Sequence, residues 1–277
     1  MDLAQAVDHV RPSIVQITFF ATDLKDDAHS QFGSPFVSQP LGTGFFVSSD
    51  GCVITARHVI HEGYRYVEHF RADAKRLHVG LAQPNTENMR GNFVLVDFEV
   101  LDEDDCHDLA LLRLKRNPFK GEVGRMFGNV PLLFDTIVLN PERPKDGTAI
   151  GISGYPLGQP VLVTNGGWIA TSWAFDITEV AMPEAPEWFR RPDIADSYLA
   201  DVEVNPGNSG GPVYLVENGT VVGLCVASKP VPVWDQQGNS VALDDKRVLY
   251  YSSGLTVVVP SCYVIELLRK HGLNWSQ

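Results

Sequence analysis

A serine lies among glycines in the stretch Val204-Asn205-Pro206-Gly207-Asn208-Ser209-Gly210-Gly211-Pro212, with an apolar run on each side. Glycine permits backbone conformations, including positive φ, that a side chain forbids. A turn built this way can hold the Ser209 hydroxyl outward and aim successive N–H groups at one point. Nucleophilic acyl transfer needs both features, an exposed hydroxyl and donors for the oxyanion that develops. The alternative is a glycine-rich hairpin turn with an incidental serine, so the interpretation depends on a base and an acid elsewhere.

A base and an acid both occur, each beside an apolar run that predicts a strand. His58 follows the run Gly51-Cys52-Val53-Ile54, and Asp108 precedes the run Leu109-Ala110-Leu111-Leu112. The chain order is therefore His58, Asp108, Ser209. That is the order found in chymotrypsin, and it differs from the orders of subtilisin and of the α/β-hydrolases.

Taken together, these segments resemble a trypsin-like serine protease, and most closely its HtrA (Deg) branch. That family carries Gly-Ser-Gly, then a threonine and His-Val, then Asp-Leu-Ala, then Asn-Pro-Gly-Asn-Ser-Gly-Gly-Pro. The matching positions here are Gly42-Thr43-Gly44, Thr55, His58-Val59, Asp108-Leu109-Ala110 and the serine stretch. The segment from Gly254 to Ser261 also resembles the family's last strand and closing helix. The resemblance runs from about Val7 to about Leu268, nearly the whole chain.

The resemblance implies a role for each of these residues. Ser209 would be the nucleophile and His58 its base, because a serine hydroxyl is unreactive near neutral pH until a base takes its proton. Asp108 would hold His58 in the tautomer that leaves its other nitrogen facing Ser209. The oxyanion hole would consist of the backbone N–H groups of Gly207 and Ser209, with Asn208 between them. His107 is a rival base, but on an extended segment its side chain points away from that of Asp108.

The fold follows from the same features. Many short strands with turn signals between them predict an all-β chain. The resemblance implies two packed antiparallel six-stranded β-barrels with short N- and C-terminal helices. We expect a single trypsin-like protease domain over residues 1–277 without a PDZ domain, with barrels at 13–130 and 145–259 and a closing helix at 260–271. Insertions are expected at 61–105 and 172–197.

Two local predictions concern turns and caps. Asn165-Gly166-Gly167 lies between two apolar runs and predicts a hairpin turn. Ser261 directly precedes an apolar helical pattern, so we expect it to be the N-cap of the closing helix.

Composition limits the classes of partner and cofactor. The chain has 22 Lys plus Arg against 34 Asp plus Glu, a formal charge of −12, which argues against binding to nucleic acid or to an anionic membrane. His58 and His61 with Glu62 suggest a metal site, but their order matches neither zinc-protease motif. We therefore expect no metal and no cofactor.

The cysteines and the N-terminus suggest a compartment. The sequence begins without a basic, apolar secretory signal and has no apolar stretch of the ~18 residues that span a membrane. The four cysteines, Cys52, Cys106, Cys225 and Cys262, form no Cys-x-x-Cys pair. We expect free thiols and a cytoplasmic protein.

The substrate is expected to be a polypeptide, and two interpretations of its P1 side chain compete. By the resemblance, the primary pocket lies between the serine turn with Val204 and the strand Cys225-Val226-Ala227. Those small apolar residues favour an aliphatic side chain. By ungapped counting, Glu203 lies six residues before Ser209, where trypsin itself has the acid that binds Lys or Arg. Strand alternation places Glu203 opposite Val202 and Val204, so we favour the aliphatic interpretation.

Three functions are consistent with these residues. The first is a serine endopeptidase that works through an acyl-enzyme. The second is a catalytically silent protease fold used as a binding module, which has no chemical need for all three of His58, Asp108 and Ser209. The third is a protease that a protein partner activates, because inserted loops can disorder an oxyanion turn. The sequence leaves the physiological substrate and the oligomeric state open.

Overall fold

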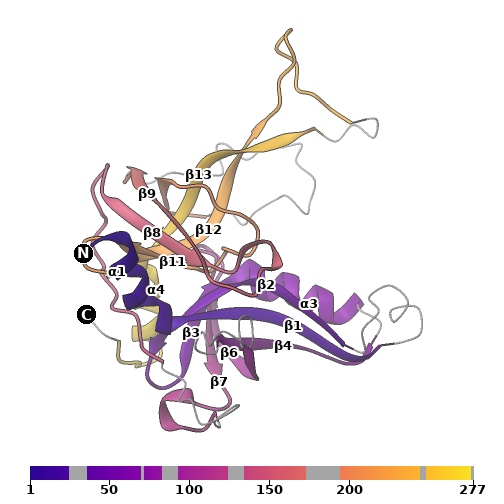
Figure 1. Cartoon of the computed structure of the whole chain (residues 1–277), viewed down its shortest axis with the longest axis vertical. Coiled ribbons are helices and arrows are strands. Elements are labelled where there is room, and N and C mark those ends of the chain that lie inside the picture. Colours follow the sequence, from indigo (N-terminus) through magenta and orange to yellow (C-terminus); the bar gives the residue numbers. More distant parts are fainter. Residues whose placement is uncertain are drawn as a thin grey trace.

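The computed structural model describes residues 1–24, 36–69, 72–82, 93–123, 134–172, 194–243 and 248–275. Two antiparallel β units pack against each other, and their strands run in two sets, from Ile14 to Leu114 and from Ala149 to Pro260 (Figure 1). Helix α1 (Leu3–Val10) precedes the first strand and helix α4 (Ser261–Lys270) follows the last. The all-β class and the two terminal helices are thus confirmed. No helix in the described ranges is long and apolar enough to cross a membrane.

The first unit is one curled sheet with the strand order β5-β4-β1-β2-β3-β7-β6. Its strands are β1 (Ile14–Leu24), β2 (Phe36–Ser48), β3 (Cys52–Ala56), β4 (Ala72–Ala82), β5 (Phe93–Val96), β6 (Phe98–Asp104) and β7 (Leu109–Leu114). The two edge strands, β5 and β6, are consecutive in the chain and only Asp97 separates them. The sheet therefore curls until its edges meet. It has seven strands rather than the six expected, because one long strand is interrupted at Asp97.

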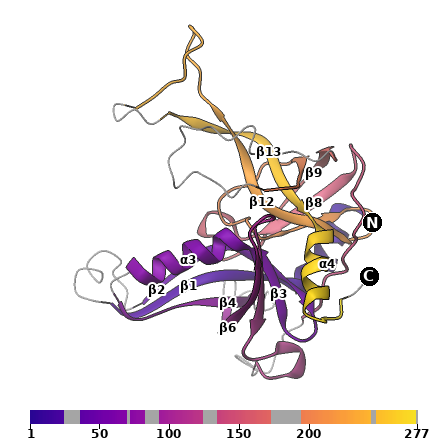
Figure 2. The same ribbon diagram turned by 180° about the vertical axis from the view of Figure 1, so that it is seen from behind.

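The second unit is a closed barrel of six strands in the order β10-β13-β12-β11-β8-β9, as expected. They are β8 (Ala149–Gly154), β9 (Val163–Thr171), β10 (Tyr198–Asp201), β11 (Pro212–Leu215), β12 (Val221–Pro232) and β13 (Tyr250–Pro260). Beyond the barrel, the hairpin of β12 and β13 continues as a long arm that projects away from both units (Figure 2).

The core extends across both units. Strand β3 is buried at every position and β7 at all but one, as continuous apolar runs predict for strands covered on both faces. The largest cluster of buried side chains joins Ile54 and Leu112 of the first unit to Leu224 and Val226 of the second. Packing of this kind fixes the two units against each other, and the residues singled out in the sequence come from both sides of that junction.

The prediction of a hairpin turn at Asn165-Gly166-Gly167 is wrong, because all three residues lie inside β9 and pair with β8. The glycines serve close packing instead. A Cβ on Gly167 would lie 2.1 Å from the backbone oxygen of Asp201, and one on Gly166 would lie 2.7 Å from the side chain of Leu3. Glycine within a strand often marks such a close approach of another segment.

The helices also depart from expectation. Helix α3 (Arg57–His69) was not predicted and packs on β1, β2 and β4. Ser261 is not the N-cap of α4, since that position is Pro260, and the Ser261 hydroxyl instead donates to the backbone oxygen of Asn140. In the described ranges, short 3-10 turns occupy Arg11–Ser13, Pro118–Lys120 and Pro156–Gly158. The expected insertion at 61–105 contains most of α3 together with β4, β5 and β6, whereas residues 173–193 of the other lie outside the described ranges.

Candidate active site

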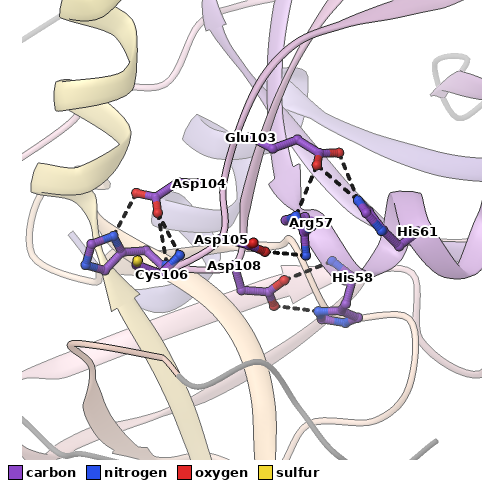
Figure 3. A network of polar contacts seen from close by, with 9 residues as sticks. Arg57, His58, His61, Glu103, Asp104, Asp105, Cys106 and Asp108 are labelled. Atoms are coloured by element: carbon purple, nitrogen blue, oxygen red, sulfur yellow. Dashed lines mark hydrogen bonds and ion pairs between the residues drawn. The ribbon is translucent and has the colours of Figure 1, made fainter.

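Strand β3 and helix α3 position His58, which lies in the first turn of α3. Strand β7 positions Asp108, which directly precedes it. Asp108 Oδ2 lies 2.5 Å from His58 Nδ1, and Asp108 Oδ1 accepts the backbone N–H of His58 at 2.8 Å. Figure 3 shows both contacts, with the carboxylate facing the ring and the backbone of the same residue. The Asp108 side chain is buried, whereas the His58 side chain is 25% exposed.

Asp108 also caps helix α3 from outside it. Its backbone oxygen accepts the N–H of Arg57 at 2.9 Å while its carboxylate accepts that of His58, so two of the unpaired donors at the helix start are satisfied. A negative charge there is favoured by the helix dipole. Asp108 has φ +54°, a left-handed conformation that Asp tolerates better than most residues. The backbone therefore fixes the carboxylate before the imidazole contacts it.

A second layer of charges surrounds this pair (Figure 3). Arg57 pairs with Glu103 at 3.0 Å and with Asp105 at 2.6 Å. His61, the other histidine of the rejected metal motif, has its Nε2 3.0 Å from Glu103. These ion pairs tie the first turn of α3 to the end of β6 and the turn after it.

His107 contacts other groups than Asp108. Its Nδ1 lies 2.7 Å from Asp104 Oδ2, and its ring stacks on Tyr263 of α4 with centroids 3.5 Å apart.

Earlier in β6, Asp102 pairs with Lys270 at 2.6 Å and with His271 at 2.8 Å. Hydrogen bonds from Lys270 and then His271 lower the pKa of Asp102 to about 2. Helix α4 of the second unit therefore anchors the strand and turn that lead into Asp108.

The serine turn packs directly against β2 and β3. The backbone N–H of Thr43 donates to the backbone oxygen of Ser209 at 2.9 Å. A Cβ on Gly210 would lie 2.0 Å from the backbone oxygen of Thr43 and 2.9 Å from the backbone nitrogen of Ala56. Gly210 has φ +86°, so two independent constraints require glycine at this position. The turn that carries Ser209 thus lies beside the end of β3, where α3 and His58 begin.

The Ser209 hydroxyl is oriented along β12. It donates to the backbone oxygen of Val226 at 3.4 Å, and among the described residues no hydrogen bond joins it to His58. Nucleophile–base bonds are often long or absent without substrate, because they tighten in the complex. Rotation about the Cα–Cβ bond of Ser209 is the one movement that redirects its hydroxyl without moving the backbone.

Some backbone N–H groups of the serine turn donate hydrogen bonds within the protein, and others do not. The N–H of Asn208 donates to Asn205 at 3.0 Å, and that of Gly210 donates to Cys225 at 2.7 Å. Within the part of the chain that the structure describes, the N–H groups of Gly207 and Ser209 have no partner. Of the three residues assigned to the oxyanion hole, Asn208 therefore contributes no free amide, whereas Gly207 and Ser209 do.

The residues assigned to the substrate pocket differ in solvent exposure. Glu203 is exposed, like Asp201, whereas Val202 and Val204 are buried, as strand alternation predicted. Cys225, Val226 and Ala227 are all buried on β12. The strand they form runs beside Ser209, since the N–H of Cys225 donates to Gly211 at 2.9 Å.

All four cysteines are free thiols, as expected: Cys52 and Cys225 are buried, Cys262 is partly buried and Cys106 is exposed. Burial raises the pKa of the Cys52 thiol, which keeps it protonated and unreactive.

Thr43 contributes to the site although no sequence motif marked it as a functional residue. It contacts the serine turn through both its backbone and its hydroxyl. The available signal was a polar residue between Gly42 and Gly44, which served only as a family marker. Tyr155 and Leu157, on the turn after β8, were also not predicted as site residues. The N–H of Tyr155 donates to the Thr43 hydroxyl, and that of Leu157 donates to the backbone oxygen of Pro206.

Comparisons with known proteins found a family model, curated relatives and solved structures that resemble this chain. The family model described as "Trypsin-like peptidase domain" matches residues 42–224, more than half of the chain. Among curated proteins, "Serine protease HTRA1" of Xenopus laevis is 25% identical over 222 residues, which cover 80% of this chain and 37% of the relative. A "Probable periplasmic serine endoprotease DegP-like" of Pseudomonas putida (strain W619) is 29% identical over 192 residues, 68% of this chain and 29% of that protein. The chain thus spans only about a third of the length of these relatives.

Solved structures support the fold alone. The structure titled "HtrA-type protease AlgW with decapeptide" superposes with a TM-score of 0.59 at 18% identity, covering 98% of this chain and 67% of that one.

Proposed function

Because the chain belongs to the trypsin-like peptidase domain family, we propose that it is a serine endopeptidase that acts through Ser209, His58 and Asp108. The observation that carries the proposal is the double contact of Asp108 with the ring and the backbone of His58. It directs Nδ1 of the imidazole to the carboxylate and leaves Nε2 available as the base. An isolated surface histidine has no such arrangement.

The reaction proceeds through an acyl-enzyme. The Ser209 hydroxyl attacks the scissile carbonyl as its proton passes to His58 Nε2. The carbonyl oxygen becomes an oxyanion, which the N–H groups of Gly207 and Ser209 stabilise. The proton then moves from His58 to the leaving amine as the C–N bond breaks. Water repeats the sequence on the ester and releases the acid. Asp108 stabilises the imidazolium in each step.

The two alternative functions, a catalytically silent binding module and a partner-activated protease, receive less support. A partner-activated protease would be expected to have its oxyanion amides misdirected in the isolated chain. Here the amides of Gly207 and Ser209 are without partners among the described residues, which favours the competent state. A silent binding module has no chemical need for all three of His58, Asp108 and Ser209, and capping of α3 by Asp108 does not require the contact of its carboxylate with the His58 ring.

For the substrate, we propose a polypeptide with an aliphatic P1 side chain. Glu203 is exposed rather than buried at a pocket base, and the neighbouring residues of β12 are small and apolar. A P1-scanned peptide library tests this on the wild type and on Glu203→Ala. Cleavage after Val, Ala, Leu or Ile that Glu203→Ala leaves unchanged supports the proposal. Cleavage only after Lys or Arg that Glu203→Ala abolishes contradicts it.

The proposed activity itself is tested with peptide cleavage by Ser209→Ala and by Ser49→Ala, a matched control at an exposed serine in the β2–β3 hairpin. Ser209→Ala should lose about 10⁴-fold or more in kcat and Ser49→Ala should lose nothing. Cleavage by a pure Ser209→Ala preparation at the wild-type rate rules out the nucleophile assignment. Cleavage that requires an added protein supports the partner-activated alternative instead.

A further inference from the structure

Thr43, on β2 of the first unit, is a fully buried residue that reaches the serine turn of the second unit. Its hydroxyl donates to the backbone oxygen of Gly207 at 2.7 Å, and its backbone N–H donates to that of Ser209 at 2.9 Å. The hydroxyl also accepts the backbone N–H of Tyr155 at 3.0 Å. A backbone N–H can only donate, so the hydroxyl proton is committed to Gly207.

These contacts fix the peptide planes around Gly207. The plane before its Cα is held by the N–H of Leu157, which donates to the backbone oxygen of Pro206 at 2.7 Å. The plane after it is held by the Thr43 hydroxyl. Gly207 has φ +102° and no side chain, so without these two bonds its backbone would be the least constrained part of the turn.

The planes around Ser209 are fixed in the same way. The N–H of Gly211 donates to the backbone oxygen of Asn208 at 2.8 Å, and the N–H of Thr43 holds the oxygen of Ser209. In a trans peptide the C=O and N–H point in opposite directions. The N–H groups of Leu157 and Gly211 hold the oxygens of Pro206 and Asn208, so they direct the amides of Gly207 and Ser209 to the opposite side. Thr43 holds the next plane along the chain in each case.

We propose that Thr43 is a positioning residue whose hydroxyl acts on both peptide planes around Gly207. It holds the plane after Gly207 directly, and through the Tyr155 N–H that it accepts it positions the turn whose Leu157 N–H holds the plane that carries the Gly207 amide. The inference rests on the proposed endopeptidase function, because it assigns a role to that amide. Oxyanion stabilisation depends on donors whose direction is set before the reaction. Thr43 supports these planes from the opposite unit, so the oxyanion hole depends on the junction of the two units and not on the serine turn alone.

The packing around Thr43 leaves room for the hydroxyl and little else. A Cβ on Gly154 would lie 2.7 Å from the Thr43 hydroxyl and 2.8 Å from the side-chain oxygen of Asn208. The backbone oxygen of Thr43 accepts the Thr55 hydroxyl at 2.6 Å. A valine at position 43 keeps the shape of threonine but leaves both Tyr155 N–H and Gly207 C=O without their partner.

Four proteins test the proposal: wild type, Thr43→Val, Thr43→Ser and Thr18→Val. Serine restores the hydroxyl that valine removes. Thr18→Val is the control for loss of a buried hydroxyl elsewhere, because Thr18 lies on β1 and donates at 2.8 Å to Gln16. Each is assayed for kcat and KM on a peptide that the wild type cleaves, at a temperature where all four are folded.

We expect Thr43→Val to lose about tenfold to a hundredfold in kcat, somewhat less than the loss of an oxyanion donor itself, with KM changed less than about threefold. Thr43→Ser should stay within about threefold of wild type, and Thr18→Val should keep its kcat even if its Tm falls. The acid limb of the pH–rate profile should not move, because His58 and Asp108 are untouched. Wild-type kcat in Thr43→Val, or an equal loss in Thr43→Ser or Thr18→Val, overturns the proposal.

A second readout does not require catalysis. Hydrogen–deuterium exchange of the peptide that covers residues 204–212 should be faster in Thr43→Val than in the other three proteins. Unchanged exchange there overturns the role of Thr43. A wild type that neither cleaves nor reacts with a fluorophosphonate would instead overturn the proposed function, whatever the exchange result.

Discussion

Replacing Asp108 by Asn should disable the enzyme through the imidazole tautomer rather than through the fold. Both carboxylate oxygens of Asp108 accept from the same residue, one from the backbone N–H of His58 and one from the ring. Asparagine has a single acceptor oxygen. The backbone N–H can only donate, so it takes that oxygen and the amide NH₂ is left facing Nδ1. Nδ1 must then accept, which places the ring proton on Nε2, where a proton from Ser209 cannot be received.

The expected loss in kcat is about 10⁴-fold, which corresponds to roughly 5.5 kcal/mol of activation free energy. The cost in free energy of unfolding is smaller, about 1–3 kcal/mol, because one charge-assisted hydrogen bond is replaced by a neutral one. The assay compares kcat for peptide cleavage with Tm and circular dichroism on the same preparations. An Asp108→Asn variant that keeps more than about a tenth of the wild-type kcat refutes this reasoning, as does one that loses activity only because it unfolds.

Three other outcomes follow from the structure. The ratio kcat/KM should fall at acidic pH because His58 must be neutral to accept a proton, and a pH–rate profile without an acid limb, measured with rate-limiting chemistry, contradicts this. The pKa of Asp102 is about 2 in the folded protein, below its unfolded value, chiefly through Lys270, so its stabilisation is present above about pH 4 and lost as pH falls towards 2. Asp102→Asn should therefore lower Tm at pH 7 but not at pH 2, and an equal Tm deficit at both contradicts the assignment. Gly167→Ala should lower the free energy of unfolding by about 1–3 kcal/mol, because its Cβ would meet Asp201 at 2.1 Å, and urea unfolding at the wild-type midpoint would disprove it.

Sequence motifs were sufficient for the fold class, and they singled out His58 and Asp108, which the structure brings into contact, because each motif lies beside a strand-like run. Helix α3 was missed for a physical reason. Gly63 lies in its middle and lowers its helix propensity. A Cβ there would lie 2.7 Å from the side chain of Leu77 on β4, so tertiary packing requires a residue that local preference opposes.

The other departures have the same origin. Gly166 and Gly167 indicate a turn by local chemistry, but here they allow other segments to approach β9 closely. Ser261 has a typical N-cap side chain, but its hydroxyl finds a partner in a distant loop. The sequence did not indicate Thr43 as a site residue, because its contact with the serine turn is made to Gly207, which lies 164 residues later in the chain and in the other unit.

Peptide mapping by mass spectrometry after incubation with a fluorophosphonate tests the central claim most directly, since the probe bonds only to an activated nucleophile. If Ser209 is the activated nucleophile, one adduct is expected in the isolated wild-type chain, on Ser209, and none in Ser209→Ala or in His58→Ala under the same conditions. An adduct on another residue, or a wild type that remains unmodified while folded, contradicts it.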